Sequence, residues 1–125
     1  MTTARENKWS ADAEVAMMGI SVPVENEEHL KYMIEYITMV FDKLETAEKI
    51  LKNAVNKYNS ENLKVTYICA NSTECGTMLT FAREEDITSE DGVLAWVENL
   101  DYPDCSELGY TFFERDRNGF IRRIG

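Results

Sequence analysis

The chain has 125 residues, of which 44% are hydrophobic and 29% are charged, a composition typical of one ordinary globular domain. Thirteen Lys and Arg residues stand against 23 Asp and Glu residues, so the formal net charge is −10. That sign disfavours direct binding to the phosphates of nucleic acid or to an anionic membrane, and it favours a basic partner.

The sequence carries no pattern typical of an export signal or a membrane span. The first ten residues are polar and charged, and the longest uncharged run, residues 15–24, is far shorter than the roughly 20 apolar residues that cross a bilayer. The cysteines form an odd set without close pairing, which favours free thiols in a reducing compartment: Cys69, Cys75 and Cys105. We therefore expect a cytoplasmic protein.

In chain order, the first predicted element is a short helix that Ser10 caps and Gly19 ends, followed by an extended piece over residues 20–24. The second is a long amphipathic helix over residues 26–59, with Asn26 as its N-cap. Apolar residues mark its buried stripe at heptad spacing: Leu30, Met33, Ile37, Val40, Leu44, Ala47, Leu51, Ala54 and Tyr58. This helix is long enough that part of it must overhang a small sheet or pair with another helix.

The second half of the chain predicts four strands and one more helix. Residues 63–70 and 77–82 form a first hairpin, and a short helix runs from Thr88 or Ser89 to Leu100. Residues 108–114 and 120–124 form a second hairpin across an Asn-Gly turn.

These elements predict an α+β fold, in which one long amphipathic helix packs on a mainly antiparallel four-stranded sheet of two hairpins, with a short second helix. We expect one domain over residues 1–125, with an N-terminal arm (1–25), the long helix (26–59) and the sheet with its inserted helix (62–125).

Residues able to carry chemistry are few. His29 is the only histidine, and its place near the start of the long helix indicates a solvated first-turn side chain rather than a catalytic base. The cysteine spacing does not match a zinc knuckle, and no glycine-rich run could cradle phosphate. We therefore predict a protein that is not an enzyme, with no catalytic residue, no metal and no cofactor.

Acidic residues are concentrated in one part of the chain. Residues 84–104 contain eight Asp and Glu residues and no Lys or Arg. If these side chains face outward, they would imitate nucleic-acid phosphates and bind a basic groove of a partner, with an aromatic residue as the apolar anchor. The alternative is that they serve only solubility. The predicted partner-binding residues are Glu84, Glu85, Asp86, Glu90, Asp91, Trp96, Asp101, Tyr102 and Asp104.

A second candidate site lies at the C-terminal end, where four arginines alternate with aromatic residues. Guanidinium groups and aromatic rings together can hold a nucleotide by paired hydrogen bonds and stacking. The alternative is structural: one aromatic set belongs to the core, and the arginines form exposed ion pairs with nearby acidic residues. The residues of this alternative ligand site are Tyr110, Phe113, Arg115, Arg117, Arg122 and Arg123.

Self-association is a further expectation. Tyr32, Tyr36 and Met39 stand together near the polar side of the long helix, and tyrosines are favoured in protein interfaces. We therefore predict that the protein can form a homodimer or a larger homo-oligomer.

In its small size, acidity and lack of a catalytic motif, the chain is similar to phage- or plasmid-encoded inhibitors of bacterial defence systems, including anti-CRISPR proteins. These inhibitors share no sequence signature, so the similarity assigns no role to any residue. It implies a viral or mobile-element protein that inhibits a nucleic-acid-binding protein by occupying its basic surface. The alternative hypothesis is a homo-oligomer that sequesters a nucleotide or a phosphorylated signal molecule.

Overall fold

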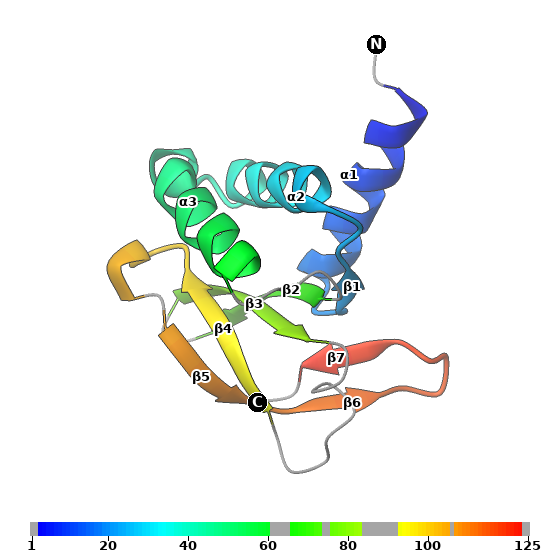
Figure 1. Cartoon of the computed structure of the whole chain (residues 1–125). Helices are drawn as coiled ribbons and strands as arrows, with labels where there is room; N and C mark the ends of the chain where they lie inside the picture. The colour runs from blue at the N-terminus through cyan, green and yellow to red at the C-terminus, as the bar shows by residue number, and fades with distance from the viewer. Residues whose placement is uncertain (1–2, 61–65, 74–75, 84–92, 106, 124–125) are drawn as a thin grey trace.

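Three helices cover one face of an antiparallel sheet in the computed structural model, which describes residues 3–60, 66–73, 76–83, 93–105 and 107–123 (Figure 1). The helices are α1 (Ala4–Met17), α2 (Glu27–Val40) and α3 (Leu44–Ser60), with a short 3-10 turn η1 at Pro103–Cys105. The strands are β1 (Val22–Pro23), β2 (Thr66–Thr73), β3 (Gly76–Arg83), β4 (Val93–Asn99), β5 (Glu107–Thr111), β6 (Phe113–Arg115) and β7 (Ile121–Arg123). The predicted α+β class is confirmed.

The sheet is a simple antiparallel meander. Strands β1 to β5 lie in sequence order, each paired with the next, and β6 and β7 form a separate two-stranded hairpin. An isolated bridge between Ile20 and Arg122 joins this hairpin to the chain just before β1. The expected sheet of two hairpins is therefore not confirmed, because β1 and β4 join the sheet and the last hairpin stands apart.

The core lies between the helices and the sheet. Because successive strand residues point to opposite faces, Leu79 and Phe81 of β3 meet the helical layer together with Ile68 of β2. A smaller cluster covers the other face, where Phe113 and Ile121 of the hairpin pack on Ala82 and Ala95. The two faces of the sheet are thus buried by different parts of the chain.

The first helix begins earlier than the sequence predicts. Thr3 is its N-cap and accepts a hydrogen bond from the backbone N–H of Glu6, while Ser10 lies inside the helix and contacts the hydroxyl of Tyr32 at 2.5 Å. Gly19, at φ 81°, follows the end of α1 as expected.

None of the helices in the described residues is both long enough and apolar enough to cross a membrane.

The predicted long helix is wrong, because the chain reverses at residues 41–43 and forms α2 and α3 instead. Asp42 takes the left-handed conformation, with φ 57°. The backbone N–H of Lys43 then donates to the carbonyl of Thr38 at 2.6 Å, and that of Asp42 to the carbonyl of Met39 at 3.1 Å. This pair of bonds is the Schellman motif that ends helices, here with Asp in the position that glycine usually takes.

The predicted helix over residues 88–100 is also wrong, because residues 93–99 form strand β4. Pairing with β3 and β5 on both sides satisfies the backbone, with Trp96 opposite Phe81 and Leu108. The β-branched and aromatic residues of this segment suit a strand, and the tertiary pairing outweighs the capping residues that suggested a helix.

The two predicted hairpins have different outcomes. Strands β2 and β3 form the first as expected. The second is shorter than predicted, because β5 pairs with β4 while only β6 and β7 pair across the Asn118-Gly119 turn. Asp116 holds that turn by accepting hydrogen bonds from the backbone N–H groups of Asn118 and Phe120.

The turn at Asp42 generates the first prediction. Replacing Asp42 by Gly removes the steric cost of a side chain at positive φ and should raise the free energy of unfolding by about 0.5–1 kcal/mol. Asp42→Val should lower it by about 1 kcal/mol or more, since β-branched residues are strained in this conformation. Urea denaturation of the three proteins measures both effects. A destabilised glycine variant would show that the left-handed turn does not set this helix end.

Candidate functional site

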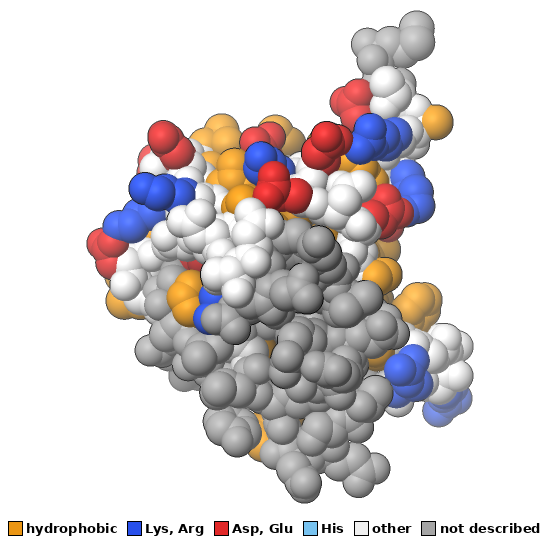
Figure 2. All heavy atoms as spheres, in the orientation of Figure 1, with side chains coloured by type: hydrophobic (Ala, Val, Ile, Leu, Met, Phe, Trp, Pro, Cys, Tyr) orange, Lys and Arg blue, Asp and Glu red, His pale blue; other side chains and the backbone are white. Residues whose placement is uncertain are grey.

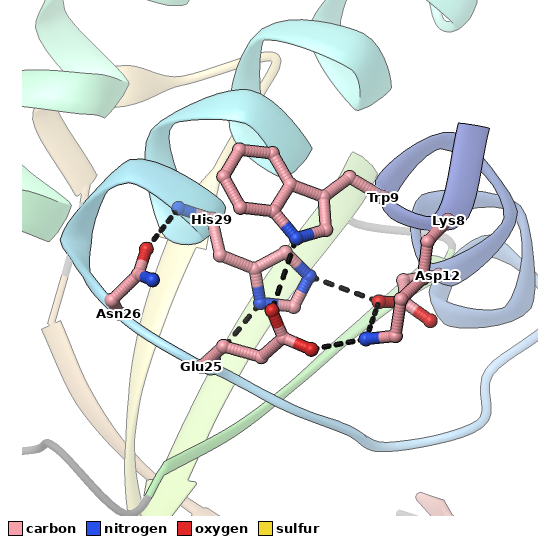
Figure 3. Close-up of polar contacts among 6 residues, drawn as sticks. All are labelled: Lys8, Trp9, Asp12, Glu25, Asn26 and His29. Atoms are coloured by element: carbon pink, nitrogen blue, oxygen red, sulfur yellow. Dashed lines mark hydrogen bonds and ion pairs between the residues drawn. The ribbon is translucent and has the colours of Figure 1, made fainter. Parts of the chain in front are cut away.

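A buried polar cluster surrounds His29, which lies where α1 meets the start of α2 (Figure 3). Its side chain is fully buried. The backbone N–H of Glu25 donates to Nδ1 at 2.9 Å, and Nε2 lies 3.1 Å from the Asp12 carboxylate. The Trp9 ring packs against the imidazole with 5.2 Å between ring centroids. Because Nδ1 accepts a hydrogen bond, the proton of the neutral ring sits on Nε2 and is donated to Asp12.

The expectation of a solvated histidine is therefore wrong. Burial lowers the pKa of His29 below its ordinary value, although Asp12 and Glu25 oppose the shift. Both ring nitrogens are engaged, and neither contacts a serine or cysteine among the described residues, so this histidine joins α1 to α2 structurally. The predicted role of Asn26 as N-cap is confirmed, because its side chain accepts a hydrogen bond from the backbone N–H of His29.

Lys8 neutralises the two acidic side chains that lie beside His29. Its ammonium forms ion pairs with Asp12 and Glu25, and the indole N–H of Trp9 donates to Glu25 at 3.1 Å. The Lys8 and Trp9 hydrogen bonds lower the pKa of Glu25. An ammonium thus lies between the two carboxylates that could otherwise bind a cation. Within the part of the chain that the structure describes, no three His, Cys, Asp or Glu side chains gather in a group that could hold a metal ion.

Tyr32 and Tyr36, expected on a free surface, instead face α1. The Tyr32 ring lies 5.6 Å from that of Trp9, and the hydroxyl of Tyr36 donates to Glu14 at 3.0 Å. These tyrosines therefore join two helices of the same chain. Met39 is exposed as expected.

Two described residues of the acidic segment that the sequence singles out pair with lysines. Asp101 pairs with Lys43 at 2.5 Å, and Asp104 pairs with Lys49 of α3. The Lys43 ammonium and the backbone N–H of Thr77 lower the pKa of Asp101. Tyr102 is exposed and Trp96 half-buried. The remaining members of the predicted site lie outside the described residues: Glu84, Glu85, Asp86, Glu90 and Asp91.

A buried carboxylate belongs to the same acidic segment. Glu98 is fully buried and accepts the indole N–H of Trp96 at 2.8 Å, so it cannot contact a partner. Three of the eight expected surface charges are therefore neutralised or buried by the fold.

The arginines of the alternative site mainly stabilise their own hairpin. Arg122 pairs with Asp116 at 3.2 Å, and Arg115 donates to the carbonyl of Gly119 at 3.0 Å. Phe113 packs on the sheet, whereas Arg117 is exposed. The side chains of Tyr110 and Arg123 lie outside the described part. Among the described residues, the contacts of these side chains do not direct them toward a common ligand site.

The helix break creates an exposed apolar corner that sequence reasoning missed. Met39, Val40 and Leu44 are 52%, 51% and 60% exposed, although the heptad pattern placed the last two in the buried stripe. We call this surface the α2–α3 corner. It also includes four exposed acidic residues, which form no ion pair among the described residues: Glu35, Asp42, Glu45 and Glu48. Figure 2 shows hydrophobic side chains on the helical layer with Asp and Glu side chains beside them.

A second surface feature is a groove of about 480 Å³ between α3 and the end of β4. We call it the α3 groove, and its lining residues are Lys49, Asn53, Asn56, Lys57, Ser60, Trp96, Pro103 and Asp104. Two residues of the predicted acidic site, Trp96 and Asp104, thus meet lysines here instead of forming an acidic surface. The helical spacing of Lys49, Asn53 and Lys57 indicates a polar stripe, but nothing local reveals that a strand residue faces it.

The buried histidine predicts a stability that depends on pH. The unfolded chain binds a proton on His29 near the ordinary pKa of 6.5, whereas the folded protein binds it only at lower pH. The free energy of unfolding should therefore fall as pH drops from 7 through this range, by at most about 1.4 kcal/mol per pH unit.

Urea denaturation at several pH values between 5 and 7.5 measures this dependence. His29→Gln should be less stable at pH 7.5 and should lose most of the pH dependence, because the chain has no other histidine. An equally steep dependence in the variant would contradict the assignment to His29.

No family model matches the chain, and no curated protein or solved structure matches it either.

Proposed function

We propose that this protein is a non-enzymatic binding protein that occupies a basic, nucleic-acid-binding surface of a partner protein, as an inhibitor would. The observation that carries the proposal is the α2–α3 corner, where three apolar side chains are more than half exposed beside four acidic ones. An apolar anchor supplies lasting affinity, and the surrounding charge supplies orientation and a fast encounter.

The charge of the corner is not balanced locally. Between Glu35 and Glu48 the chain has four acidic residues and one basic residue, Lys43. Lys43 is already paired with Asp101. The corner therefore presents net negative charge, and the net charge of −10 adds to the attraction for a basic surface at longer range.

The apolar side chains of the corner suit a partner of varied shape. Met39 is unbranched and adapts to irregular surfaces, while Val40 and Leu44 present stiffer branched groups. Their exposure costs solubility without benefit unless something covers them. A basic surface with a shallow apolar depression, such as a nucleic-acid groove lined by Lys, Arg and aromatic residues, has complementary chemistry.

The first test of this proposal concerns charge. Affinity capture from a bacterial lysate, at low and at high salt, would identify candidate partners, and association of the purified partner is then measured on a biosensor. Glu48→Lys should slow association by about threefold at low salt and flatten its salt dependence, because it reverses one steering charge.

Glu114→Lys is the matched control, since Glu114 is also exposed but lies on β6, away from the helical layer (Figure 1). It changes the net charge equally and should have a smaller effect. If the two variants slow association equally, only the net charge matters and the corner is not the binding surface.

The second test concerns the apolar anchor. Leu44→Ser should speed dissociation about tenfold, because it removes an anchor from the centre of the contact. Tyr102→Ser is the control, since both side chains are 60% exposed but Tyr102 lies in the acidic segment that the sequence favours. Faster dissociation of the Tyr102 variant alone would place the contact at that segment and contradict the corner. Circular dichroism verifies that both variants fold.

A further inference from the structure

We infer that the α3 groove binds a nucleoside monophosphate or a ligand of the same class, with a planar base and a phosphate. This site shares no residue with the proposed partner surface, because the corner ends at Glu48 while the groove runs along α3 from Lys49 to Ser60. The two proposals can therefore fail independently.

The shape of the groove is the first reason. It is a shallow groove open to solvent, and its volume of about 480 Å³ falls in the range of small-molecule sites. One wall is a continuous polar stripe of α3, and the other comes from Pro103 and Asp104 of η1, with Trp96 contributed by β4. Helix and strand residues converge here from positions more than 35 apart in sequence.

The indole of Trp96 is the second reason, because it is held in place. Its N–H donates to Glu98 at 2.8 Å, and Glu98 is itself fully buried. A half-buried indole that is fixed in this way offers a rigid surface for stacking, and bases of any identity stack on aromatic rings. The Lys57 ammonium lies 5.0 Å from the centre of this ring.

The third reason is the charge along the same helix face. Lys49, Asn53, Asn56, Lys57 and Ser60 follow the helical repeat, so α3 contributes two ammonium groups and no carboxylate to the groove. A phosphate attracts an ammonium more strongly than an indole face does, so Lys49 and Lys57 are the groups that a ligand phosphate would contact. The asparagine amides can both donate to and accept from a base edge.

Asp104 opposes anion binding in the free protein. Its carboxylate forms an ion pair with Lys49, and the ammonium group of Lys49 is one that a ligand phosphate would contact. A ligand phosphate must therefore replace this carboxylate. This competition gives the proposal a distinctive consequence, because removal of an acidic residue should tighten binding at this site.

The test uses the intact chain and two-dimensional NMR of its two indole N–H groups. Titration with AMP, GMP, CMP and UMP should shift the Trp96 resonance while that of Trp9, which is buried beside His29, stays in place. Inorganic phosphate and adenosine should each bind more weakly than AMP, because inorganic phosphate lacks the base and adenosine lacks the phosphate.

Three variants make the test specific. Lys57→Met should weaken AMP binding by about fivefold, and Asp104→Asn should strengthen it by about twofold. Lys52→Met is the matched control on the same helix, since Lys52 is exposed and does not line the groove. Glu48→Lys, at the proposed partner surface, should leave the Trp96 shift unchanged.

The inference is overturned if none of the nucleotides shifts the Trp96 resonance at millimolar concentration. It is also overturned if Lys52→Met weakens binding as much as Lys57→Met, or if phosphate binds as tightly as AMP. The amide spectrum of each variant shows whether it retains the fold, so a loss of binding is not confused with unfolding.

Discussion

The left-handed turn at Asp42 is the constraint on which the arrangement of the helical layer depends. A straight helix over the same residues would carry Val40 and Leu44 on one continuous buried stripe. The turn reverses the chain, leaves these side chains exposed and lays α3 beside β4 (Figure 1). Both the α2–α3 corner and the α3 groove exist because this reversal occurs where it does.

Contacts across the molecule hold the reversed chain in place. Lys43, directly after the turn, pairs with Asp101, and the hydroxyl of Thr46 lies 3.2 Å from the carbonyl of Leu100. Asp101 also accepts the backbone N–H of Thr77 at the start of β3. The acidic residues that would otherwise repel one another thus tie helix, strand and turn together. Part of the excess negative charge therefore stabilises the fold.

The sequence predicted well where the deciding interactions are local. Asn26 caps a helix through its own neighbouring backbone, and the chemistry of Asp116 and Gly119 specifies a turn within four residues. The failures have a different origin. Apolar spacing continues through residues 41–44 without a glycine or proline, so periodicity could not show the break. Residues 93–99 become a strand through pairing with β3 and β5, and His29 is buried by a helix that lies before it in the chain.

The account's central claim is that a partner covers the α2–α3 corner. Hydrogen–deuterium exchange of the chain, alone and with its captured partner, tests that claim most directly because it locates the contact without any substitution. The account predicts slower exchange concentrated in peptides that span residues 36–48. Protection of residues 84–104 or of the C-terminal hairpin, with unchanged exchange at 36–48, would contradict it.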